Sequence, residues 1–334
     1  MFKSILCILS LLTCLYSQYT GQQRYVIHGY AQGTDYTIKY YAEQPLITKI
    51  AIDSVLLKID SSMSLYKPYS LINQFNASNK GVRIDDQFAT VMRKSFEIYK
   101  NTSGKFDVTV APLVQAWGFG AQPVQRFPEE SDIQLLLKVV GMEKLELKKG
   151  NFLKKKKPGV MVDLNGIAQG FSVDVVADFL LSKGVTSFVV EIGGELRIKG
   201  VKPDGSLTRI GIEGPALTRD GTPQIRHIAG IKEGAITTSG NYRKFHQNGA
   251  KRITHLIDPK TGYPLENQMI SVTVFAKDAI TADGYDNALM AMDVKEALQF
   301  IETRADLEAY FIYHQSDGSV ADTLSRGFKE MIIK

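Results

Sequence analysis

The sequence has very little cysteine. Among its 334 residues only Cys7 and Cys14 are cysteines, and both lie in the first segment of the chain. The remainder therefore has no residues for a disulfide framework or for cysteine catalysis, and no His/Cys cluster has the spacing of a zinc site. After Leu15, no apolar stretch approaches the ~20 residues that a membrane-spanning helix needs. Net charge is also low: 40 Lys and Arg oppose 35 Asp and Glu, and +5 over this length does not indicate a nucleic-acid surface.

The composition that remains is that of an ordinary soluble globular protein. Hydrophobic residues make up 44% of the chain and charged residues 22%. These proportions exclude disorder, collagen and coiled coil as descriptions of the whole chain. The length suffices to bury a substantial core without disulfides or a structural metal.

The start of the chain is typical of a secretory signal. Lys3 supplies the positive charge, and the apolar run from Ile5 to Leu15 spans 11 residues, too few to cross a bilayer. We expect residues 1–17 to be a signal peptide, with cleavage after Ser17 leaving a cysteine-free protein. The alternative is an imperfect lipoprotein signal ending before Cys14. Either form is expected to be exported to the periplasm, soluble in the first case and lipid-anchored in the second.

Helical and strand patterns are interspersed without regular βαβ alternation, and no linker divides the chain, so we expect one α+β domain over 25–334. Expected helices lie around 52–59, 88–99, 129–140, 173–181, 279–292 and 294–304. Expected strands lie at 36–40, 160–164, 187–192, 207–212, 225–231, 253–257, 270–275 and 310–313. Residues 145–163 are expected to form a hairpin with Lys154 to Lys157 near its tip. We interpret this lysine run as a solvated turn.

Four segments carry residues suited to chemistry. The first, from Asp163 to Gly170, has glycines between a strand and a helix, where backbone N–H groups and the helix N-terminus favour an anion such as phosphate. It matches neither the dinucleotide fingerprint nor the P-loop, and a merely tight turn is equally compatible with it. The second pairs Asp283 with Asn287, one helical turn apart and on one face with Asp286. Carboxylate and amide oxygens on one face can hold Mg²⁺, but a solvated polar face explains the same pattern.

The other two segments are weaker alone. Asp258, Pro259 and Gly262 are residues that favour a turn. His255 comes just before them, so we expect it at the end of an extended segment. A histidine there can be a general acid or base, although a lone histidine is more often structural. The fourth segment ends in a small, hydroxyl-rich turn at Ser239, without the elbow motif of a serine nucleophile.

Taken together and in order, these segments resemble one family. They read DLNGIAQGFSVD, EIGGE, TTSGNY, HLIDPKTGYP and TADGYDNALMAM, and upstream SLYKPYSLINQFN and GKFDVTVAPLVQAWGFG. This order of motifs is similar to that of the ApbE family of FAD:protein FMN transferases, from about Gly33 to Phe328. The resemblance implies an ApbE-type, T-fold-like α+β fold with mixed, largely antiparallel sheets and packed helices.

The resemblance also implies an activity. Such an enzyme splits FAD with Mg²⁺, transfers the FMN half through its phosphate to a threonine of a target flavoprotein, and releases AMP. Targets in this family include redox-complex subunits, recognised by a short motif around the threonine. Two alternatives stay open: an FAD pyrophosphatase that yields FMN and AMP, and a non-catalytic FAD-binding protein. An NAD-dependent enzyme is disfavoured because the sequence lacks the dinucleotide-binding fingerprint.

The family's functional positions carry over as expectations. Mg²⁺ would be held by Gly166, Asp283 and Asn287, and His255 would be catalytic. The residues expected at the FAD site are Phe75, Asn76, Phe106, Asp107, Asp163, Gln169, Ser239 and His255. Three departures are visible: Asn287 replaces the usual threonine ligand, Gln169 removes a charge, and Gln32 stands where a methionine flavin contact is usual.

Overall fold

The structure is a computed structural model that describes residues 21–214, 224–241, 245–248 and 251–333. The segment expected to be a signal peptide lies outside the described residues. Within the described part of the chain, no helix is long and apolar enough to cross a membrane.

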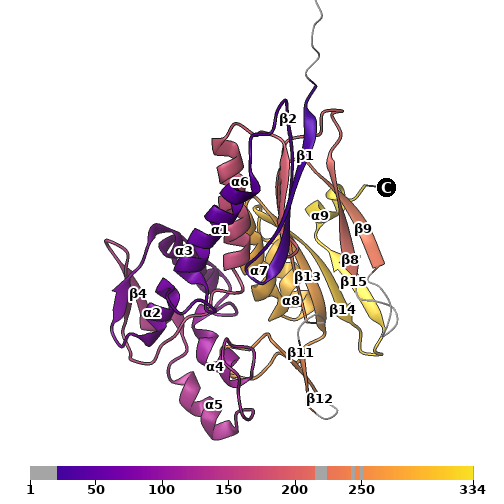
Figure 1. Cartoon of the computed structure of the whole chain (residues 1–334). Helices are drawn as coiled ribbons and strands as arrows, with labels where there is room; N and C mark the ends of the chain where they lie inside the picture. Colours follow the sequence, from indigo (N-terminus) through magenta and orange to yellow (C-terminus); the bar gives the residue numbers. More distant parts are fainter. Residues whose placement is uncertain (1–20, 215–223, 242–244, 249–250, 334) are drawn as a thin grey trace, which may run out of the picture.

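An eight-stranded sheet forms the centre of the molecule, and each strand pairs antiparallel with its neighbours (Figure 1). The strand order is β1-β2-β6-β7-β10-β13-β14-β15. The bounds are β1 Gln23–Ala31, β2 Thr34–Ala42, β6 Phe188–Ile192, β7 Glu195–Lys199, β10 Gly234–Gly240, β13 Met269–Ala276, β14 Leu307–His314 and β15 Val320–Leu324. The first and second halves of the chain thus meet where β7 pairs with β10.

Three smaller sheets surround it. One has the order β3-β5-β4, and the others are the hairpins β8–β9 and β11–β12. Their bounds are β3 Gly81–Arg83, β4 Leu145–Lys148, β5 Phe152–Lys155, β8 Thr208–Gly214, β9 Gln224–Ile231, β11 Phe245–Asn248 and β12 Lys251–Thr254. All of these pairs are antiparallel, so the expected α+β class with largely antiparallel sheets is confirmed.

The helices match the periodic segments of the sequence. Their bounds are α1 Lys49–Met63, α2 Leu71–Ala77, α3 Asp86–Asn101, α4 Ala111–Ala116, α5 Glu130–Leu137, α6 Ala168–Ser182, α7 Ala279–Met290, α8 Val294–Glu302 and α9 Arg326–Met331, with short 3₁₀ turns η1 Val108–Val110 and η2 Met142–Lys144. The short helices α2, α4 and α9 have too few turns to show a period in the sequence.

Both faces of the central sheet are covered. Helices α1, α6 and α7 lie on one side, while the β8–β9 hairpin and α9 lie on the other (Figure 1). Two hydrophobic clusters correspond to these two faces. The central strand β13 therefore has no solvent face, and all its residues except Phe275 are buried.

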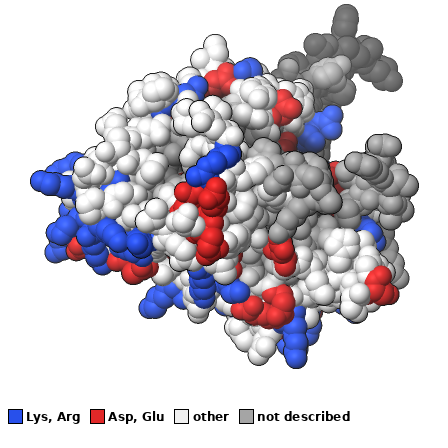
Figure 2. Space-filling view, turned by 90° about the horizontal axis from the view of Figure 1, so that it is seen from below, with Lys and Arg blue, Asp and Glu red and all other residues white. Residues whose placement is uncertain are grey.

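Two expectations about the chain were wrong. The segment 160–164 is not a strand: Asp163 N donates to the carbonyl of Val108 (2.8 Å) in a loop instead of joining a ladder. The lysine run lies at the end of β5 and not at the hairpin tip, and Lys155 is only 4% exposed. Other Lys and Arg side chains do gather on the side of the molecule where this small sheet lies (Figure 2).

Candidate active site

Helix α7 carries the central residues of the candidate site and packs inside the molecule. Its first turn is capped by Asp278, whose carboxylate accepts from Thr281 N (3.1 Å), and the helix packs between β10, β13 and α6. Asp283 is 4% exposed and Asp286 only 1%. The interpretation of this side of the helix as a solvated polar face is therefore wrong: it is polar and buried.

The three residues expected to hold a metal come together here. The amide nitrogen of Asn287 lies 3.2 Å from the carbonyl oxygen of Gly166, 3.1 Å from that of Asp283 and 3.5 Å from Asp283 Oδ1. The other carboxylate oxygen of Asp283 accepts from Gly170 N (2.8 Å), at the first turn of α6. Residues 121 positions apart in sequence, Gly166 and Asn287, thus share one small site.

The oxygen atoms of this cluster fit a hard divalent cation. Burial, and after it the negative charge of Asp283, raises the pKa of the Asp286 carboxyl; burial also raises the pKa of Asp283. Among the described residues, no group of three or more His, Cys, Asp or Glu is placed to hold a metal ion by itself. Mg²⁺ suits such an open set, because it is usually held by one or two carboxylates and completes its shell with water and substrate phosphates.

The loop before α6 is fixed at several points. The Asp163 carboxylate accepts from Asn165 N (2.8 Å), which closes a tight turn, and its negative charge adds to burial in raising the pKa of Tyr66. At the other end, Gln169 donates to the Ile192 carbonyl (2.9 Å) and to Glu195 (2.6 Å). The first turn of α6 lies beside the oxygen cluster, since Gly170 N donates to Asp283, and the dipole of this helix end favours a nearby phosphate.

The side chain of Asn76 holds the backbone ahead of the loop in place. Its Nδ2 donates to the Val162 carbonyl (2.9 Å) and its Oδ1 accepts from Val162 N (2.8 Å). Both polar atoms of the side chain are thus paired with backbone just ahead of Asp163. Asn76 therefore positions the loop, and a contact with FAD stays a prediction.

The other upstream residues are buried. Phe75 is 0% exposed and packs edge-on to Phe88, with Lys155 Nζ 4.5 Å from its ring centre. Phe106 is also buried. The Asp107 carboxylate accepts from Thr109 N (2.7 Å) and Thr109 Oγ1 (2.5 Å). In this conformation the Phe75 ring has no surface for a ligand, and Asp107 acts as a cap for η1.

Ser239 and His255 approach from other elements. Ser239 Oγ, near the end of β10, donates to Asn287 Oδ1 at 3.5 Å, so it belongs to the oxygen cluster. His255 follows β12 and packs edge-on against Phe119, with ring centroids 6.2 Å apart. The turn after it is held in place by Trp117, which donates to the Gly262 carbonyl (2.8 Å). The catalytic role of His255 stays a prediction.

Sequence reasoning missed a buried ion pair next to this site. Arg197 Nη1 on β7 lies 2.5 Å from Asp174 Oδ1, and the same carboxylate accepts from Ala279 N (2.9 Å) and Ile280 N (2.8 Å) at the start of α7. The pair ties α6, α7 and β7 together. The available signal was an aspartate among the apolar residues of α6, between Val173 and Val176.

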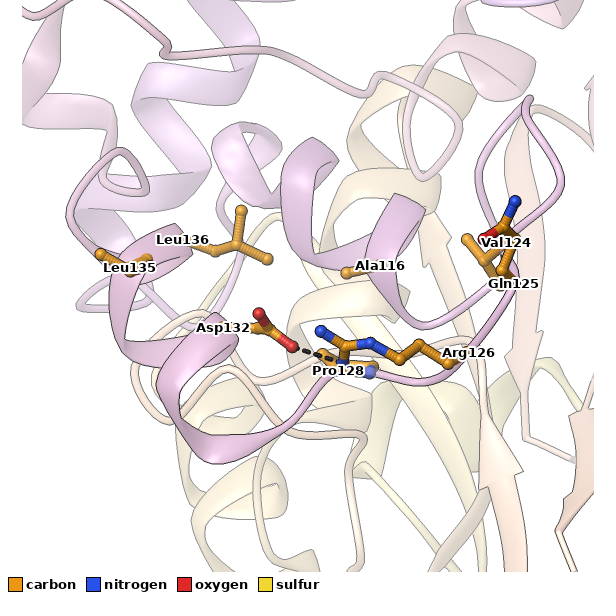
Figure 3. A pocket seen from close by; sticks show the side chains of 8 residues that line it. All are labelled: Ala116, Val124, Gln125, Arg126, Pro128, Asp132, Leu135 and Leu136. Atoms are coloured by element: carbon orange, nitrogen blue, oxygen red, sulfur yellow. Dashed lines mark hydrogen bonds and ion pairs between the residues drawn. The ribbon is translucent and has the colours of Figure 1, made fainter.

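A separate groove lies on another part of the surface. It runs between the ends of α4 and α5 and the segment 124–128, and an ion pair of 2.6 Å joins Arg126 to Asp132 beside it (Figure 3). None of its lining residues is an expected site residue. We therefore place the chemistry at α7 and not in this groove.

Comparison with known proteins agrees with the motifs. The profile described as the ApbE family matches residues 32–311. The FAD:protein FMN transferase of Vibrio cholerae is 37% identical over 319 residues, covering 92% of each chain, and that of Haemophilus influenzae is 34% identical over 317, covering 91% and 90%. The solved flavin transferase ApbE from Vibrio cholerae superimposes with a TM-score of 0.83 at 36% identity, covering 93% of this chain and 99% of that one. This chain belongs to the ApbE family.

Proposed function

We propose that this chain is a Mg²⁺-dependent FAD:protein FMN transferase. The observation that carries the proposal is the convergence of the Gly166 carbonyl and the Asp283 carboxylate beside the first turn of α6, in a chain whose relatives have this name. A cation-binding site next to a helix N-terminus is suited to the negative charge of a pyrophosphate substrate.

The residues would divide the work as follows. Gly166 and Asp283 would hold Mg²⁺, with Asn287 beside them; when bound, the ion neutralises charge on the pyrophosphate oxygens. A phosphate of FAD would lie beside the first turn of α6, where the positive end of the helix dipole favours negative charge. His255 accepts the proton of the acceptor threonine hydroxyl, whose oxygen forms a bond to the phosphorus of the FMN half. The bond from that phosphorus to the bridging oxygen breaks, and AMP leaves.

The acceptor and the location are part of the same proposal. We propose that the acceptor is a flavoprotein with a short motif around its threonine, such as a subunit of a redox complex. The chain would act after export to the periplasm, either soluble or lipid-anchored. The apolar run from Ile5 to Leu15 supports export, and the cysteine at position 14 keeps the anchored form open.

The test uses the chain from Gln18 onward with FAD, Mg²⁺ and an acceptor that carries the threonine motif. We expect flavin fluorescence on the acceptor after denaturing electrophoresis, with AMP released in equal amount. EDTA and Asp283→Asn should abolish both signals. Asp178→Asn, a matched loss of one carboxylate at an exposed position of α6, should leave them unchanged.

Other outcomes identify the alternatives. Equal AMP and free FMN with a dark acceptor band would indicate a pyrophosphatase. Intact FAD under all conditions would leave a binding protein.

A further inference from the structure

The buried face of α7 carries a carboxylate that the proposed function does not use. Asp286 is 1% exposed, and the charges that act on it are those of Asp283 and Glu195, which are both negative. Among the described residues, no ion pair joins a basic side chain to Asp283 or Asp286; the nearby Arg197 is held by Asp174. Buried carboxylates without a basic partner need a proton or a bound cation.

The surrounding oxygens converge on one point. That point is occupied by the amide nitrogen of Asn287, which lies 3.0 Å from Asp286 Oδ1. It also contacts the Gly166 carbonyl and both the backbone carbonyl and Oδ1 of Asp283. Oxygens from three residues thus surround a group that carries partial positive charge. The arrangement is suited to a positive centre, and carboxylate and carbonyl oxygens are the ligands that hard divalent cations take.

An independent observation comes from the neighbouring strand. Thr237 on β10 is 1% exposed and its hydroxyl lies close to the Asp286 carboxylate. Even so, Thr237 Oγ1 is buried without a hydrogen-bond partner of good geometry. Leaving a buried hydroxyl unsatisfied costs about 1–3 kcal/mol, and a cation bound between Asp286 and Thr237 would remove this cost.

We infer that Asp286 is a ligand of the divalent cation in this chain, with the Thr237 hydroxyl beside it, and that the Asn287 amide nitrogen holds the ion's place in the metal-free protein. The inference rests on the proposed function, because it concerns the same ion. It also accounts for Asn287 in place of the usual threonine. The Asn287 amide presents its nitrogen to the site, and the Asp286 carboxylate supplies the ligand oxygen that the threonine would have given.

The test measures binding of Mn²⁺, as a spectroscopic substitute for Mg²⁺, to the purified chain by the electron paramagnetic resonance signal of the free ion. Titrations are made without FAD and with FAD. We expect one Mn²⁺ per chain, and Asp286→Asn should weaken its binding at least about tenfold. Asp178→Asn, which removes a carboxylate from an exposed position of α6, should not change it.

Thermal unfolding provides a readout that is independent of activity. Asp286→Asn should unfold at a higher temperature than the wild type without metal, because one buried charge is gone, and Mn²⁺ should raise its Tm by less. Asn287→Asp keeps the inference testable if that variant does not fold. It puts an oxygen where the amide nitrogen lies, so it should lower the metal-free Tm and increase the rise caused by Mn²⁺.

The outcomes separate the two proposals. If Asp286→Asn binds Mn²⁺ as the wild type does while Asp283→Asn does not, Asp286 is a protonated structural group and the inference is wrong, but the metal site proposed for the function stands. If neither substitution changes Mn²⁺ binding, the metal site itself is wrong.

Discussion

Asn76 joins two segments that are 86 residues apart, and its removal should be costly. Asn76→Ala deletes the hydrogen bonds to Val162 N and Val162 O, both just ahead of the loop that begins at Asp163. Val162 is 0% exposed, so water does not readily replace the lost partners. Two net hydrogen bonds of about 1 kcal/mol each, plus a penalty for the unsatisfied groups, predict a loss of about 2–4 kcal/mol in the free energy of unfolding.

The effect on FAD binding should be smaller. The loop keeps other anchors, since Asp163 N still donates to the Val108 carbonyl (2.8 Å) and Gly170 N to Asp283. Apparent affinity falls only by the fraction of molecules in which the loop is ordered. We therefore expect a Kd for FAD that rises about 2- to 10-fold.

Urea denaturation gives the stability and quenching of flavin fluorescence gives the Kd. Ser325→Ala is the control: it also removes a buried hydrogen bond, from Ala309 N to Ser325 Oγ (3.0 Å), but between β14 and α9. It should lower stability and leave the Kd unchanged. The reasoning is refuted if Asn76→Ala costs less than about 0.5 kcal/mol, well below the value of one hydrogen bond, or if the control weakens FAD binding equally.

Three further predictions concern separate parts of the molecule. His255→Ala should depress transfer to the acceptor by about 10²–10⁴-fold while the Kd for FAD stays nearly unchanged; a loss of binding without a specific loss of turnover would contradict a role as base. Arg197→Met should cost about 3 kcal/mol in urea denaturation because it leaves the buried Asp174 carboxylate without its basic partner, although Ala279 N and Ile280 N still donate to it. Adding Asp174→Asn should recover part of that loss, and no recovery would mean that Arg197 acts through packing alone. Burial lowers the pKa of Lys155 from 10.5 to about 8, so the folded chain loses this proton before the unfolded chain does. The stability of the wild type should therefore rise relative to Lys155→Met between pH 8 and 10.5, by up to about 3 kcal/mol, and parallel pH profiles of the two proteins would contradict it.

Periodicity predicted most of the framework. The long amphipathic helices around 52–59, 88–99 and 173–181 are α1, α3 and α6, and the apolar segment 270–275 is the central strand β13. These elements are identifiable from the sequence because their buried apolar residues recur with the helical or strand period over several repeats. The segment 160–164 was mistaken for a strand because its apolar residues are buried by a loop, which periodicity does not distinguish from a sheet.

The candidate site was predictable in its residues but not in its environment. The spacing of Asp283 and Asn287 places them on one face of a helix, but only the packing of α7 against β10 and α6 shows that this face is buried. Lys155 reads as one of four solvated lysines, although its ammonium group donates to the carbonyls of Asn76 (3.1 Å) and Ser78 (2.7 Å). Such assignments depend on contacts between distant segments, which local pattern does not contain.

The junction of β7 with β10 has a consequence for folding. Only three residue pairs join these strands, namely Gly234 with Ile198, Ala235 with Arg197 and Ile236 with Leu196. The cation site is complete on neither half of the chain, because Gly166 and Asn287 lie on opposite sides of this junction. Because long-range pairing forms late, after the entropy of closing long loops has been overcome, a partly folded chain lacks the cation site. Metal-dependent substrate binding is therefore expected only in chains in which both halves have folded.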